Sequence, residues 1–125
     1  MVDYRIELVL FPVSDVDRAR AFYGDRLGWP VDHDQTVSVE IRFVQVTPPG
    51  SACSIAFGRG ISGMAPGSLR ALQVVVDDIE KAHADLTERG VDVSGIDDQP
   101  WGRFVGFADP DGNTWSVQQL PARPA

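Results

Sequence analysis

The sequence has little of several features that would assign a protein to a class at once. It has one cysteine, Cys53, which excludes an internal disulfide framework. No apolar run approaches the roughly 20 residues that a membrane-spanning helix needs, and the first residues lack the pattern of a signal peptide. With 11 basic against 18 acidic residues, the net charge of −7 argues against nucleic acid or an anionic membrane as a partner. We therefore expect a cytoplasmic protein.

A stretch of the first half recurs in the second half. Residues 13–23 read VSDVDRARAFY and residues 76–86 read VDDIEKAHADL, so Asp15 and Asp78 occupy matching places 63 residues apart. Each aspartate stands where a helix N-cap belongs, and apolar residues follow at spacings of three and four, which predicts two helices. Gly28 and Gly90 are expected to end them. The repeat indicates two copies of one supersecondary unit.

The remaining segments predict strands around both helices. We expect strands at residues 4–13, 29–34, 39–47 and 52–57, and again at 69–76, 91–95, 102–108 and 113–119. The glycine-rich residues 58–67 are expected to connect the halves. Residues 1–125 then form one α+β domain with two tandem βαβββ modules, module 1 at about 4–57 and module 2 at about 69–119. We expect the modules to form an incomplete, curved mixed-sheet barrel with the helices outside.

Three motifs together support a more specific interpretation. They are the stretch at residues 13–23, the pair Leu27-Gly28 and the turn Asp109-Pro110-Asp111-Gly112-Asn113. Their combination resembles the vicinal oxygen chelate superfamily, which holds glyoxalase I, extradiol dioxygenases, fosfomycin resistance enzymes and bleomycin resistance proteins. The resemblance covers nearly the whole chain. The stretch QPWGR at residues 99–103 is most similar to the bleomycin resistance branch.

The resemblance also implies where a divalent metal would bind. In the enzymes of this family, ligands come from the first and fourth strand of each half, and the matching positions here are Leu8, Ser54, Ala71 and Ser116. None of these side chains is an imidazole, carboxylate or thiolate, the groups that such an ion prefers. A shift of one residue would bring in Glu7, but one carboxylate does not make a site. We expect no metal and no other cofactor.

In place of metal ligands, neutral side chains are expected on the inner face of the curved sheets, because alternate residues of a strand share a face. This face would line a cavity. Trp101, Arg103 and Phe104 are placed near the mouth of the cavity, where an indole and a guanidinium can stack on a planar ligand. Alternatives to ligand binding stay open for these residues. Trp101 and Phe104 would instead pack the core or a dimer interface, and Leu8 and Leu10 would fill the cavity. For His33, which lies between two aspartates, the alternative is a surface position without a role in the site. The candidate ligand-binding residues are Leu8, Leu10, His33, Ser54, Ala71, Gln73, Trp101, Arg103, Phe104, Ser116 and Gln118.

Two functions follow from these observations. The first is metal-independent binding, or sequestration, of a small amphipathic or aromatic organic molecule, as in bleomycin-resistance-type proteins; the acidic net charge suits a cationic ligand. The resemblance implies that such binders act as homodimers. The second function is a lyase or isomerase of the glyoxalase-like superfamily, with or without a divalent metal. No catalytic residues can be assigned, so it stays open whether the protein is an enzyme. A scaffold without a ligand is a third alternative.

Overall fold

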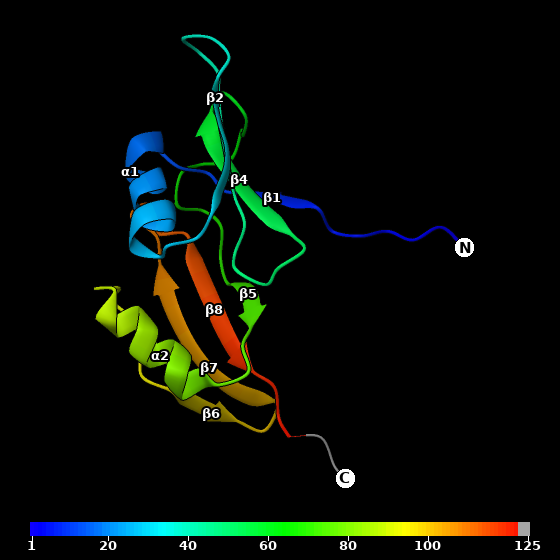
Figure 1. Ribbon diagram of the computed structural model, residues 1–125, viewed down its shortest axis with the longest axis vertical. Coiled ribbons are helices and arrows are strands. Elements are labelled where there is room, and N and C mark those ends of the chain that lie inside the picture. Colours follow the sequence, from blue (N-terminus) through cyan, green and yellow to red (C-terminus); the bar gives the residue numbers. More distant parts are fainter. Residues whose placement is uncertain (123–125) are drawn as a thin grey trace.

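The computed structural model describes residues 1–122 and contains two separate four-stranded sheets (Figure 1). The first half consists of β1 (Leu8–Leu10), α1 (Val16–Arg20), η1 (Ala21–Arg26), β2 (Val31–Thr36), β3 (Arg42–Val46) and β4 (Ser54–Arg59). The second half consists of β5 (Leu72–Val75), α2 (Ile79–Glu88), β6 (Asp97–Gln99), β7 (Gly102–Ala108) and β8 (Thr114–Gln119). This order confirms the predicted α+β fold with two βαβββ modules.

The two sheets have the same topology. The first sheet has the strand order β1-β4-β3-β2 and the second has β5-β8-β7-β6. In each, the strand before the helix pairs in parallel with the last strand of its module, and the other neighbours are antiparallel. Within residues 1–122 the sheets do not close into a barrel, which agrees with the incomplete barrel expected from the sequence. No helix in this part of the chain has the length and apolar character to cross a membrane.

Both helices begin at the predicted aspartates. The carboxylate of Asp15 accepts a hydrogen bond from the Arg18 backbone N–H at 3.1 Å. The carboxylate of Asp78 accepts from Glu80 N and Lys81 N, each at 3.1 Å. Both aspartates have extended backbone angles, so each side chain reaches the first turn of its helix and satisfies N–H groups that have no partner within it.

The helix ends also follow the local sequence. Gly28 and Gly90 have φ angles of 72° and 78°, the left-handed region that glycine adopts without strain. The first helix widens before its end, because α1 passes into the π-helical segment η1. There the Leu27 N–H donates to the Phe22 carbonyl five residues earlier, at 2.9 Å.

Two strand predictions differ from the structure. β1 covers only Leu8–Leu10 of the predicted strand at residues 4–13. The strand predicted at residues 91–95 is wrong: this segment holds Val91 in the core, while β6 lies at Asp97–Gln99, where a loop was expected. β6 forms because Gly102, at φ 152°, turns the chain so that residues 97–99 pair with β7. A tertiary pairing thus overrides the low strand propensity of Asp97 and Asp98.

The core lies between the helices and one face of each sheet. Phe11 of the first half stacks on Trp115 of the second, with ring centroids 4.9 Å apart. Tyr23 stacks on Phe57 at 5.5 Å, and none of these four rings is more than 2% exposed. One aromatic core therefore serves both modules and covers the helix side of both sheets. We call the opposite side of each sheet its open face.

A buried polar network joins the modules beside these rings. The Tyr23 hydroxyl donates to Asp109 Oδ2 at 2.8 Å and accepts from Trp115 Nε1 at 3.0 Å. Asn113 Nδ2 donates to the same carboxylate at 2.8 Å and to the Pro12 carbonyl at 2.9 Å. Burial, with Asp109 alongside, raises the pKa of Tyr23, so its hydroxyl remains a donor. The turn motif at residues 109–113 thus links the two halves.

Candidate functional site

The open face of the second sheet gathers most of the predicted residues of the second half. Gln73 of β5 pairs with Ser116 of β8, and Phe104 of β7 pairs with Gln118 of β8. Since paired residues point to the same side and alternate residues share a side, all four lie on the open face. Their neighbours on the helix side belong to the core: Leu72, Val105, Trp115 and Val117.

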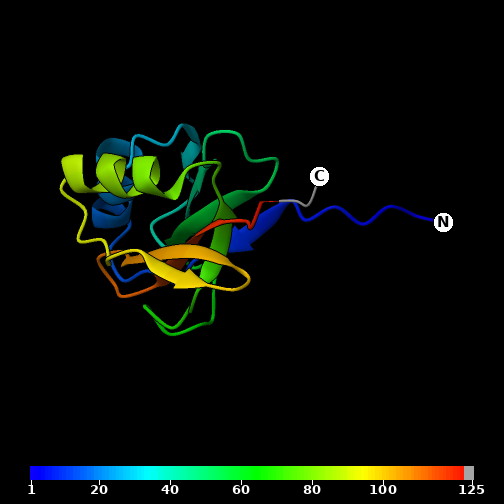
Figure 2. The same ribbon diagram turned by 90° about the horizontal axis from the view of Figure 1, so that it is seen from below.

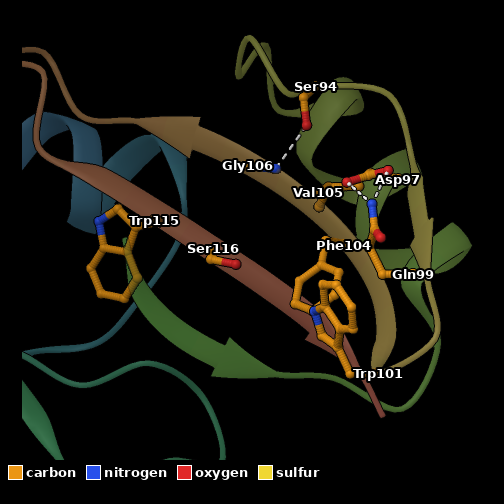
Figure 3. A pocket seen from close by; sticks show the side chains of 9 residues that line it. All are labelled: Ser94, Asp97, Gln99, Trp101, Phe104, Val105, Gly106, Trp115 and Ser116. Atoms are coloured by element: carbon orange, nitrogen blue, oxygen red, sulfur yellow. Dashed lines mark hydrogen bonds between the residues drawn. The ribbon is translucent and has the colours of Figure 1, made fainter. Parts of the chain in front are cut away.

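A pocket lies on this sheet, and Figure 3 shows its lining side chains. Its volume is about 480 Å³, which is within the usual range for small-molecule sites. Trp101, on the turn between β6 and β7, and Phe104 lie at one end, with Ser116 between them and Trp115 (Figure 3). The residues that line this second-sheet pocket are Ser94, Asp97, Gln99, Trp101, Phe104, Val105, Gly106, Trp115 and Ser116.

The turn that carries Trp101 is tied to the sheet by a hydrogen bond to the Trp101 backbone. Trp101 is 61% exposed, and its indole lies at the edge of the pocket. Gln118 Nε2 donates to the Trp101 carbonyl at 3.0 Å, and Gln73 Nε2 donates to Gln118 Oε1 at 2.6 Å. Ser116 Oγ lies 3.4 Å from Gln73 Oε1. The amides of the open face therefore fix the turn that carries the indole.

Arg103 lies away from this pocket. It follows Gly102 on the helix side of β7, where its Nε donates to Asp98 at 2.6 Å and its Nη2 lies 4.0 Å from Glu80 of α2. The hydrogen bond to Asp98 raises the pKa of the Arg103 guanidinium. Arg103 thus contacts the helix side, and the structure does not bring it together with Trp101 on the open face.

The predicted residues of the first half lie on the open face of the first sheet. Leu8 of β1 pairs with Ser54 of β4, and Leu10 is 37% exposed. His33 is exposed on β2, opposite Gln45. None of these four predicted residues, Leu8, Leu10, His33 or Ser54, lines the second-sheet pocket. One chain therefore holds the candidate residues as two groups, one on each sheet.

Ser54 shares the open face with Leu8 but is buried there. Its side chain belongs to a residue only 6% exposed, and its Oγ shares a hydrogen bond with Thr47 Oγ1 at 2.7 Å. The Thr47 hydroxyl in turn donates to the carboxylate of Asp32. The hydroxyl of Ser54 is thus already engaged within the first sheet.

The side chains at the implied metal positions do not fit a divalent ion. Leu8 and Ala71 have no donor atom, and Ser54 is engaged with Thr47. Ala71 also precedes β5, at a φ of 56°, and the strand register places Gln73 opposite Ser116, just as Leu8 lies opposite Ser54. Within residues 1–122, no three His, Cys, Asp or Glu side chains come together in a group that could hold a metal.

Sequence reasoning missed several residues of the pocket. Asp97 and Gln99 lie beside it because β6 pairs with β7, and Gln99 Nε2 donates to both oxygens of Asp97 at 3.1 Å. Ser94 Oγ accepts from the Gly106 N–H at 2.8 Å and so fixes the opposite wall. The missing signal was the strand β6: with it, alternation would have placed Asp97 and Gln99 on the same face as Phe104.

Comparison with known proteins shows the family to which the sequence is similar. The model of the Glyoxalase/Bleomycin resistance protein/Dioxygenase superfamily matches residues 5–117. A curated relative, the uncharacterized protein YetH of Bacillus subtilis (strain 168), is 26% identical over 119 residues, which cover 92% of this chain and 98% of YetH.

Solved structures match over nearly the full length. TnmS3, an antibiotic binding protein from Streptomyces sp. CB03234, is 39% identical, with a TM-score of 0.85 over 97% of this chain and 99% of its own. A superfamily member from Sphaerobacter thermophilus DSM 20745 is 32% identical, with a TM-score of 0.80 over 94% of this chain and 98% of its own.

Proposed function

Because the chain belongs to the glyoxalase/bleomycin resistance protein/dioxygenase superfamily, we propose that it binds, and thereby sequesters, a small aromatic or amphipathic organic molecule without a metal. The proposal places the ligand in the second-sheet pocket. It also includes the predicted homodimer and the predicted cytoplasmic location. The antibiotic-binding function of the similar protein TnmS3 supports a ligand of this class.

The observation that carries the proposal is the exposed indole of Trp101 at the edge of a pocket with a second ring, Phe104. Exposing an indole to water is unfavourable. The hydrogen bond from Gln118 Nε2 to the Trp101 backbone carbonyl, at 3.0 Å, fixes the turn that carries the indole. A flat ligand that lies against these rings would exchange water for aromatic contact on its faces.

The polar groups of the pocket limit the charge of the ligand. Ser94, Gln99 and Ser116 are neutral, and Asp97 is the one ionisable side chain in the lining. Together with the net charge of −7, this carboxylate favours a ligand that is neutral or positively charged and disfavours an anion.

Binding can be tested with planar dyes and a known antibiotic. We expect proflavine, which is flat and cationic, or bleomycin to quench tryptophan fluorescence and raise the melting temperature, because a ligand that binds only the folded state stabilises it. An anionic dye of similar size should bind more weakly. If none of a panel of cationic and neutral aromatic compounds raises the melting temperature, the proposal is wrong.

A pair of variants locates the site. Trp101→Ala should weaken binding about 30-fold, equal to about 2 kcal/mol, because a central aromatic anchor of a site contributes on this scale. Met64→Ala is the control, since Met64 is also exposed, at 46%, but does not line the second-sheet pocket. Equal affinities of the two variants would place the ligand elsewhere.

A further inference from the structure

The second-sheet pocket holds one carboxylate that no cation of residues 1–122 neutralises. Asp97 is exposed, and it is the one ionisable side chain in the lining. In this part of the chain, none of the ion pairs that lysine and arginine side chains form includes Asp97. Gln99 Nε2 donates to both of its oxygens at 3.1 Å. A neutral amide therefore holds the carboxylate in place and leaves its charge uncompensated.

The next residue, Asp98, has a different environment. It lies opposite Arg103 in the register of β6 and β7, and Arg103 Nε donates to its carboxylate at 2.6 Å. Because consecutive residues of a strand point to opposite faces, Asp98 lies on the helix side and Asp97 on the open face. Figure 2 shows both helices on one side of β6 and β7 (yellow to orange), so the open face is turned away from them.

An aromatic ring lies beside Asp97. The register of β6 and β7 places Asp97 directly opposite Phe104. Paired residues of antiparallel strands point to the same side, with their Cβ atoms about 4.5–5.5 Å apart. Trp101 lies at the same end of the pocket as Phe104 (Figure 3). A carboxylate and two aromatic rings therefore border one end of the pocket.

An ammonium group is attracted by both features. The N–H groups of a protonated amine donate to a carboxylate in short, charge-assisted hydrogen bonds. The faces of aromatic rings attract the same positive charge. A ligand hydroxyl could donate to the carboxylate but would leave its charge uncompensated, and an anionic group would be repelled.

Protection of the sheet edge is the alternative explanation of Asp97. β6 is an edge strand of three residues, two of which are aspartates, and charges on edge strands prevent pairing with another chain. Edge protection does not depend on the face to which an aspartate points. On this explanation Asp97 and Asp98 would be equivalent, and neither would affect the binding of a ligand.

We infer that Asp97 selects a protonated amine as the ligand of the second-sheet pocket. The ammonium group binds the Asp97 carboxylate beside Phe104 and Trp101, and the flat body of the ligand extends along the open face toward Ser116. The pocket volume of about 480 Å³ leaves room for a body of several rings. This inference rests on the proposed function and narrows its ligand from neutral or cationic molecules to amines.

Two probes with the same ring system test the inference. Pyrenemethylamine is protonated at neutral pH, whereas pyrenemethanol has a neutral hydroxyl in place of the ammonium group. We expect the unaltered chain to bind the amine at least about tenfold more tightly than the alcohol, because hydrogen bonds to charged groups are the stronger ones. Quenching of tryptophan fluorescence measures both affinities. Added salt should weaken binding of the amine and leave binding of the alcohol unchanged.

Asp97→Asn and its neighbour Asp98→Asn form the matched pair of variants. Both remove one negative charge from β6, but Asp98 lies on the helix side. Asp97→Asn should weaken binding of the amine at least about tenfold and change binding of the alcohol less than about twofold. Asp98→Asn should retain the preference for the amine. Circular dichroism checks that each variant is folded, and the salt dependence of the unaltered chain tests the inference without any variant.

The outcomes separate this inference from the proposed function. If Asp97→Asn binds the amine as tightly as the unaltered chain does, or loses affinity for both probes equally, the selection by Asp97 is wrong although the pocket binds planar molecules. If Asp98→Asn loses the preference as well, net charge and not Asp97 selects the amine, and the inference is overturned. Equal or tighter binding of the alcohol to the unaltered chain also overturns it. The dye panel and the Trp101→Ala comparison decide the proposed function separately.

Discussion

Tyr23→Phe removes one oxygen atom from the junction between the modules. The Tyr23 side chain is 0% exposed, and its hydroxyl lies between Asp109 Oδ2, at 2.8 Å, and Trp115 Nε1, at 3.0 Å. The substitution leaves the indole N–H of Trp115 without its partner and takes one of the donors from the Asp109 carboxylate. Asn113 Nδ2 still donates to that carboxylate at 2.8 Å, so the charge remains partly compensated.

The two losses set the size of the effect. An unsatisfied buried donor costs about 1–3 kcal/mol, and a hydrogen bond to a charged group contributes about 1.5–3 kcal/mol. We expect the free energy of unfolding to fall by about 3 kcal/mol, toward the lower end of their sum, because Asn113 remains and the ring keeps its stacking. For a domain of this length, the melting temperature should fall by about 10–12 °C.

Urea unfolding followed by tryptophan fluorescence measures this change, with all variants at one protein concentration because a dimer would make stability concentration-dependent. Tyr4→Phe is the matched control: it removes the same atom from a side chain that is 90% exposed, and it should change stability by less than about 0.5 kcal/mol. A loss below about 1 kcal/mol for Tyr23→Phe would refute the view that this hydroxyl ties the modules together.

Three further predictions use other parts of the structure. Hydrogen bonds from Arg42 lower the pKa of Asp34 below its usual 3.8. The ionised carboxylate therefore stabilises the folded state above pH 3.8, and this stabilisation is lost as the pH falls further. Asp34→Asn should lower the free energy of unfolding by about 1 kcal/mol at pH 7 and change it by almost nothing in acid unfolding near pH 2. Gly67→Ala should destabilise the folded protein by more than about 3 kcal/mol, because the new Cβ would lie 2.1 Å from the Asp111 carbonyl oxygen. Gly50 also has a positive φ but has open space around it, so Gly50→Ala should destabilise the protein by about 1–2 kcal/mol. Thermal unfolding of the two variants measures the difference. Titration with Zn²⁺ or Ni²⁺, followed by calorimetry, should show no stoichiometric site, and EDTA should leave dye affinity unchanged; a tight site with one ion per chain would instead favour the lyase or isomerase.

The fold was predicted from residues whose effect on the backbone is local. The capping aspartates Asp15 and Asp78, and the glycines at the helix ends, act within a few residues of their own position, so their effect is visible in the sequence. β6 was missed because its strand conformation comes from pairing with β7, which lies beyond a turn. Likewise β1 is shorter than its β-prone sequence, because only residues 8–10 have β4 beside them.

Strand alternation predicted the part of the candidate site that lies on the strands. Gln73, Ser116 and Gln118 share a face as expected, because each lies in a strand whose boundaries were nearly correct. Arg103 and Phe104 are consecutive in β7, so the same alternation places them on opposite faces, and Phe104 is the one that lies on the open face. The turn that carries Trp101 is tied to β8 by a hydrogen bond from Gln118 to the Trp101 carbonyl, which no local pattern indicates.

The duplicated modules differ at one place that explains why the pocket lies on the second sheet. Ser54 and Ser116 occupy equivalent positions, opposite Leu8 and Gln73 respectively. Beside Ser54, the side chain of Thr47 takes up the space and binds the serine hydroxyl. Beside Ser116 the neighbouring strand has Gly106, which has no side chain, and within residues 1–122 the Ser116 hydroxyl makes a single, long contact of 3.4 Å, with Gln73 Oε1. The same unit therefore leaves the Ser54 hydroxyl bound to Thr47 in one half and places the Ser116 hydroxyl in the lining of the second-sheet pocket in the other.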